Sequence, residues 1–103
     1  MNVLLIDTTN NKEVVVCLRI DGKEFVKKQP LDTRKAQVVL PMAEKLLQEK
    51  KLRLKDLTGI EVNPGPGSFT GIRVGLSIAN TLGFLLQIPV NSKKVGELAE
   101  AIY

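Results

Sequence analysis

The chain has 103 residues, of which 44% are apolar and 4% aromatic, and its formal net charge is +4. This length fits one domain, and the apolar content excludes a disordered chain and predicts a core of mainly Val, Ile and Leu. Histidine is absent, which excludes a histidine-based triad, a histidine general base and a histidine metal ligand.

The positive charges are spread along the chain, which favours a solvated surface over a nucleic-acid site. Cys17, the single cysteine, lies within an apolar run at 14–18. We expect it to be a buried small hydrophobe in a reducing compartment. The N-terminus lacks the basic region of a signal peptide, and the apolar stretch 74–86 is too short to span a membrane. We therefore expect a cytoplasmic protein with no membrane partner.

Three strand patterns open the chain, at Val3–Ile6, Glu13–Ile20 and Glu24–Gln29. The pair Asp21-Gly22 is a strong hairpin signal between the second and third strands. An antiparallel meander is predicted. Because the first two runs are continuously apolar, we expect both faces of the sheet to be covered.

A helix is predicted from about Thr33 to Lys51, with a buried stripe that includes Val39 and Leu46. Pro41 interrupts this pattern and is expected either in the first turn or at a kink. A fourth strand follows at Thr58–Asn63.

The second predicted helix, Phe69–Leu86, is apolar on every side, and Arg73 is its only charge. Ser68 is its expected N-cap. Small residues recur at every fourth position: Gly71, Gly75, Ala79 and Gly83. Interior glycines cost roughly 0.5–1 kcal/mol each relative to Ala, so this stripe needs a packing reason. Packing on the chain's own sheet and packing on a partner protein would account for it equally well.

A short fifth strand at Ile88–Val90 and a last helix at Lys93–Ile102, capped by Ser92, complete the prediction. The order βββαβαβα predicts an α/β fold with a mixed five-stranded sheet and helices on both faces. We expect residues 1–103 to form a single domain.

Two loops have the composition of phosphate sites. Gly65, Gly67 and Ser68 precede a helix N-terminus, where anions bind well. However, no lysine follows as in a Walker A motif, and Thr70 stands where a dinucleotide fingerprint has its third glycine. The balance favours a tight helix entry over a phosphate cradle.

The second loop is Asp7-Thr8, directly after a buried strand, which could hold a metal-bound phosphate. A turn residue that bonds its own backbone is the favoured interpretation. The acidic residues form no evident pair, and Ser68 and Thr70 have no partner base. The residues alone thus predict no catalytic group and no metal site, and they favour a packing or docking device.

The segment 63–83, which reads NPGPGSFTGIRVGLSIANTLG, closely resembles the TsaB (YeaZ) family of bacterial tRNA threonylcarbamoyladenosine (t6A) biosynthesis proteins. Leu5–Thr8 and Leu40–Met42 are also similar to family motifs, and the resemblance covers essentially the whole chain. It implies the actin-like ATPase fold, which has two RNase H-like lobes. Members run to about twice this length, so the resemblance implies an N-terminal lobe without the second lobe.

The resemblance further implies a non-catalytic subunit without a cofactor, which binds a TsaD-type paralogue or forms a homodimer when alone. A TsaE-type ATPase is a further implied partner, and tRNA contact is expected to be at most indirect. One departure is Lys35-Ala36, where many relatives have a His-Ser-like pair. The implied contact surface lies on the two central helices and comprises Val39, Met42, Leu46, Gly71, Arg73, Gly75, Ile78 and Ala79.

Two alternatives stay open. The first is a small nucleotide-binding enzyme that uses the Asp7-Thr8 and Gly65–Ser68 loops, with a second lobe supplied by another chain. Nucleotides in this superfamily bind between lobes, so one lobe has no complete cleft. The second alternative is a truncated gene product with no independent role.

Overall fold

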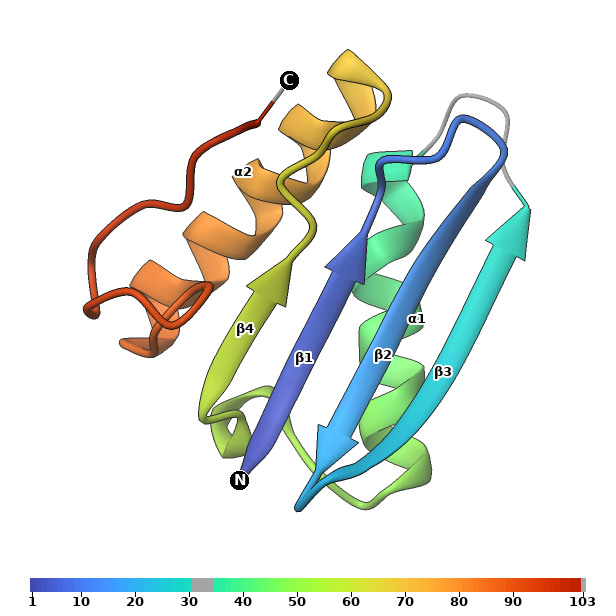
Figure 1. The fold of residues 1–103 in the computed structure, drawn as a ribbon. Coiled ribbons are helices and arrows are strands. Elements are labelled where there is room, and N and C mark those ends of the chain that lie inside the picture. The colour runs from blue at the N-terminus through green and yellow to red at the C-terminus, as the bar shows by residue number, and fades with distance from the viewer. Residues whose placement is uncertain (31–34, 103) are drawn as a thin grey trace.

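The computed structural model describes residues 1–30 and 35–102, and its strands form a single four-stranded sheet (Figure 1). Strands β1 (Asn2–Asp7), β2 (Glu13–Ile20) and β3 (Lys23–Pro30) make the predicted antiparallel meander. Strand β4 (Gly59–Val62) pairs in parallel with β1, which gives the order β3-β2-β1-β4. The mixed sheet is therefore confirmed, with four strands rather than five.

Local sequence explains the β2–β3 hairpin. Asp21 and Gly22 both have positive φ, 49° and 87°, which is the geometry of a two-residue turn whose twist matches the strands. Ile20 pairs with Lys23, and this register continues to Glu13 and Pro30.

Both helices, α1 (Lys35–Glu49) and α2 (Phe69–Leu86), pack on the same face of the sheet. Alternate strand residues, such as Leu4 and Ile6, point to this face and are buried. The prediction of helices on both faces is wrong. A continuously apolar strand indicates that both of its faces can be buried, but it does not show which structural element covers each face.

The boundaries of α2 are those predicted. Ser68 caps the helix, because its Oγ accepts a hydrogen bond from the Gly71 N–H at 3.2 Å. Gln87 ends the helix in the left-handed conformation. By length and composition α2 could cross a membrane, but seven of its residues are buried in this fold, as in a core helix.

Helix α1 begins at Lys35, so the predicted start at Thr33 lies outside the described residues. Pro41 lies beyond the first turn and is exposed, and the helix continues through it. The interior of α1 therefore accommodates the proline on its solvent side.

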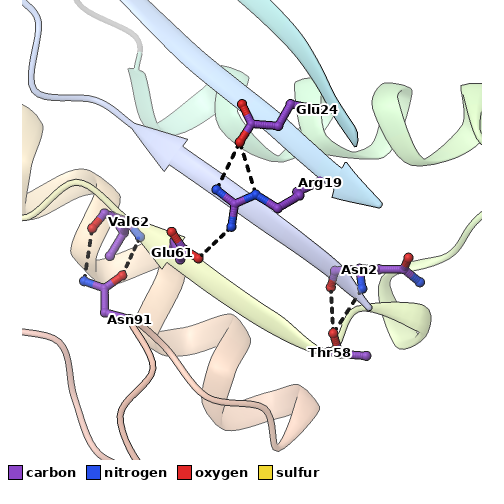
Figure 2. A network of polar contacts seen from close by, with 7 residues as sticks. All are labelled: Asn2, Arg19, Glu24, Thr58, Glu61, Val62 and Asn91. Atoms are coloured by element: carbon purple, nitrogen blue, oxygen red, sulfur yellow. Dashed lines mark hydrogen bonds and ion pairs between the residues drawn. The ribbon is translucent and has the colours of Figure 1, made fainter. Parts of the chain in front are cut away.

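The predicted fifth strand is reduced to one parallel bridge between Ile60 and Val90. The Ile60 N–H donates to Pro89 O, and the Asn91 N–H donates to Ile60 O. The Asn91 side chain then takes the place of the next residue, because its Oδ1 accepts from Val62 N–H at 2.7 Å and its Nδ2 donates to Val62 O at 3.1 Å (Figure 2). A side-chain amide completes the ladder that a longer strand would have formed.

The predicted last helix, Lys93–Ile102, does not form, and Ser92 is not an N-cap. Asn91 and Ser92 both have positive φ, 52° and 60°, which redirects the chain. The segment then runs back along α2 without regular structure (Figure 1). Asn80 in α2 holds it by exchanging two hydrogen bonds with the backbone of Ala99, at 2.9 and 3.1 Å. These bonds occupy backbone groups that a helix would need for itself.

Candidate functional site

The two loops with the composition of phosphate sites lie side by side at the carboxyl ends of β1 and β4. Parallel pairing of these strands brings their ends to the same edge of the sheet. The Asn63 N–H donates to Ile6 O at 2.9 Å, and the Ser68 N–H donates to Thr9 O at 2.8 Å. The parallel pairing of β1 and β4 therefore brings the Asp7–Thr9 loop next to the Gly65–Ser68 loop, although they lie far apart in the sequence.

The Asp7 carboxylate holds this junction together. Its Oδ1 accepts from the Thr9 N–H at 2.9 Å and from the Thr9 hydroxyl at 2.7 Å. Its Oδ2 accepts from Asn63 Nδ2 at 3.1 Å. The first bond is the turn in which an aspartate bonds the backbone two residues on, and the last joins the turn to the neighbouring loop.

Thr8 fixes the start of α2 over the end of β1. Its side chain is fully buried, and its hydroxyl donates to Gly71 O at 2.5 Å. Ser68 bonds the N–H of the same glycine. Both backbone groups of Gly71 therefore contact capping side chains, which sets the position of the first turn of α2 against the sheet.

Gly65 and Gly67 are required by close approach between protein segments. A Cβ on Gly65, whose φ is +116°, would overlap Ile102 O. A Cβ on Gly67 would lie 2.7 Å from Thr9 Cβ. In this structure the two glycines therefore make room for other segments of the same chain.

Six of the eight predicted contact residues lie inside the chain's own core. They are Val39, Met42, Leu46, Gly71, Gly75 and Ala79, all buried. A Cβ on Gly75 would overlap the Thr8 hydroxyl and approach Val62 Cγ2 to 3.3 Å. The small-residue stripe therefore lets α2 lie close to its own sheet. These six residues are buried within this chain and form no part of its exposed surface.

The outer surface of α1 and α2 carries exposed apolar residues that the sequence reasoning did not assign. Phe69, Phe84 and Leu85 of α2 are 57%, 65% and 68% exposed, and Leu40 of α1 is 36% exposed. The sequence shows only that these α2 positions are offset from the glycine stripe, and the structure shows that this stripe faces the sheet. We call this surface the outer helix face.

A shallow groove on the outer helix face runs between Ala36 of α1 and the first three turns of α2. Arg73 and Ile78, the two remaining predicted contact residues, both line it. Arg73 is exposed, with its guanidinium carbon 5.4 Å from the centroid of the Phe69 ring. Ile78 is half-buried and also packs against the core.

In the described part of the chain, no helix covers the opposite face of the sheet, which has a depression lined by Leu5, Val15, Cys17 and Val26. We call it the open face. Arg19 spans it, with hydrogen bonds to Glu24 on β3 and Glu61 on β4 at 3.0–3.1 Å (Figure 2).

Local charges and burial set the pKa values of two side chains on the open face. The bonds to Glu24 and then Glu61 raise the pKa of Arg19. Burial raises the pKa of the Cys17 thiol, and the Glu24 carboxylate adds to this effect. Both shifts favour the protonated form, so Arg19 stays charged and Cys17 stays neutral.

The chain matches known proteins over most of its length. Residues 31–92 match the family model described as TsaD, tRNA N6-adenosine threonylcarbamoyltransferase. The chain is 34% identical over 94 residues to the tRNA threonylcarbamoyladenosine biosynthesis protein TsaB of Bacillus subtilis, covering 89% of this chain and 40% of that protein. It is 46% identical over 52 residues to TsaB of Buchnera aphidicola from Schizaphis graminum, covering 50% of this chain and 25% of that protein.

A solved structure of YeaZ from Pseudomonas aeruginosa superposes with a TM-score of 0.82 and 31% sequence identity. The superposition covers 90% of this chain and 43% of that one, so the chain spans less than half the length of these relatives. Both the sequence and the fold lead to the same group. The chain belongs to the TsaB (YeaZ) family, among the proteins that the tRNA N6-adenosine threonylcarbamoyltransferase model describes.

Proposed function

We propose that this chain is a non-catalytic docking subunit in t6A modification of tRNA, which binds a TsaD-type paralogue or a second copy of itself. The curated relatives are named as t6A biosynthesis proteins. The observation that carries the docking role is the outer helix face. Its large apolar side chains are exposed, and Arg73 is the only charge on α2. Exposed apolar patches of this kind are typical of protein-binding surfaces.

The residues proposed here to contact the partner differ from most of those expected from the sequence. The partner would lie in the groove beside Ala36 and cover Ser77 and the exposed part of Ile78. Phe69 would supply an aromatic anchor of the type enriched at interface hot spots. Arg73, stacked on that ring, would fix the orientation of the partner.

Ser77→Arg tests this surface, because Ser77 is exposed and the substitution adds bulk and charge without touching the core. We expect the association with a TsaD-type paralogue, measured by light scattering and pull-down, to weaken at least tenfold. Asn11→Arg, in the exposed β1–β2 turn, is the matched control and should bind normally. If folded Ser77→Arg associates as tightly as the control, the outer helix face is not the docking surface.

The nucleotide-binding alternative has one observation in its favour, which is that the Asp7–Thr9 and Gly65–Ser68 loops meet. Against it, the Asp7 carboxylate, the Thr8 hydroxyl and the Ser68 Oγ all bond to other parts of the protein. Calorimetry with ATP and ADP separates the two proposals. Binding tighter than about 10 μM by the isolated chain would favour the nucleotide site.

A further inference from the structure

A second groove, between the edge strand β3 and helix α1, is lined by positive and amide side chains. Lys27, Lys28 and Gln29 come from β3, and Gln37 and Lys45 come from α1. Met42 forms part of its buried apolar floor. Lys45 lies far from Lys27 and Lys28 in the sequence, so the charge pattern along the chain does not show that these lysines line one groove.

Positive charge exceeds negative charge at this groove. Lys27 Nζ lies 2.9 Å from Glu49 Oε2, and Lys45 and Lys50 act on the same carboxylate. The hydrogen bond from Lys27, followed by the attraction of all three lysines, holds the pKa of Glu49 below its usual range. Lys50 also stacks over the Phe25 ring, with Nζ 3.7 Å from its centroid. One carboxylate thus faces three lysines, and Lys28 adds a fourth positive charge.

We propose that this groove binds the phosphate backbone of RNA. Lysines neutralise phosphates, and most protein–nucleic acid hydrogen bonds go to phosphate and sugar. The amides of Gln29 and Gln37 can both donate and accept hydrogen bonds, which suits the ribose 2′-hydroxyl that distinguishes RNA from DNA. The choice of RNA rests on the proposed role in tRNA modification. It goes beyond that role, because it makes the RNA contact direct.

Neither protection of the sheet edge nor membrane binding accounts for the lysines as well as RNA does. Lysines on an edge strand block pairing with further strands, but this does not account for Lys45, which belongs to α1 and not to the edge strand. An anionic membrane surface would require exposed apolar residues beside the lysines. Among the described residues, none of the large exposed hydrophobic side chains lines this groove.

The test compares two triple variants that each remove three positive charges. The groove variant is Lys27→Gln, Lys28→Gln and Lys45→Gln, and the control is Lys12→Gln, Lys93→Gln and Lys94→Gln. Fluorescence anisotropy with a labelled RNA stem-loop measures binding, both by the chain alone and with saturating TsaD-type paralogue. We expect the groove variant to bind at least tenfold more weakly than the control. The slope of log K against log salt should be less negative by about 2–3 for the three lost phosphate contacts.

Three results would overturn the proposal: equal loss in both variants, no loss in either, or groove-dependent binding to phosphatidylglycerol vesicles without RNA binding. Circular dichroism checks that both variants stay folded. Association with the paralogue is measured in parallel. The groove variant should still associate, and Ser77→Arg should still bind RNA in isolation. A failure of the docking surface is therefore distinguishable from a failure of the RNA groove.

Discussion

The two faces of the sheet are built from the same strands and end in different environments. Leu4 and Ile6 point toward the helices and are at most 2% exposed. Leu5, between them, lines the open face and is half-buried. The helix face is sealed by close contacts, such as that between Gly75 and Thr8, whereas exposed ion pairs cross the open face.

The apolar composition of a strand therefore does not determine which of its faces is covered by helices. The run Val3–Ile6 is equally apolar on both sides, yet only one side is covered by this chain's helices. Substitutions on the two faces should accordingly differ in cost. Four experiments test that contrast, beginning with the substitution that should destabilise the protein most.

Gly75→Ala should be the most damaging small substitution on the helix face. The added methyl group overlaps the Thr8 hydroxyl, and overpacking of this kind costs about 1–3 kcal/mol. Urea unfolding measures the loss. Ser77→Ala, exposed on the same helix, is the matched control and should be neutral or slightly stabilising. Equal stability of the two variants would show that α2 is not closely packed on the sheet at Gly75.

Thr8→Val removes the hydroxyl that donates to Gly71 O while keeping the shape of the side chain. Because this buried carbonyl loses a partner, we expect destabilisation of about 1 kcal/mol. Thr81→Val, on the exposed side of α2, should change little. Urea unfolding measures both variants, and a Thr8 variant as stable as the Thr81 variant would contradict the prediction.

Cys17 tests the pH response of the open face. Burial raises the pKa of its thiol in the folded state. Its contribution to stability is therefore complete below the pKa of the unfolded thiol, about 8.5, and is lost as the pH rises through the higher folded value. Iodoacetamide at pH 8 should react more slowly with the folded chain than with the chain in urea. Equal rates would mean that the thiol is neither buried nor shifted.

Arg19→Gln should have the smallest effect on stability. It breaks both ion pairs across the open face, but all three side chains are at least 33% exposed, and surface pairs of this kind contribute little. We expect an unchanged urea midpoint in moderate salt. A clear loss would show that the network organises β2, β3 and β4, and the contrast between the faces would be weaker than described.

Local signals in the sequence predicted the elements whose ends are fixed by nearby residues. Ser68 caps α2 where expected, and Asp21-Gly22 makes the predicted turn. The secondary structure of the residues after Leu86 was harder to predict, because their conformation depends on hydrogen-bond partners that are distant in the sequence. Asn80 bonds Ala99 and Asn91 bonds Val62, and neither pairing is visible in a window of the sequence.

For the candidate site, the sequence identified the two loops but not their roles. Asp7 makes the turn that the sequence favoured, and Gly65 lies against Ile102 of the same chain. The direction of the small-residue stripe could not be predicted, because an apolar helix has no polar side to orient it. The exposed positions of Phe69 and Phe84 became apparent only once Gly75 was placed against Thr8.

The amide of Asn91 has a consequence for how the protein behaves at high concentration. By bonding both Val62 N and Val62 O, it occupies groups that a strand from another molecule would need. At the other edge of the sheet, the exposed Lys23 and Lys28 on β3 disfavour pairing with a second copy. Both edges are therefore protected against edge-to-edge aggregation, one by a side-chain amide and the other by charge.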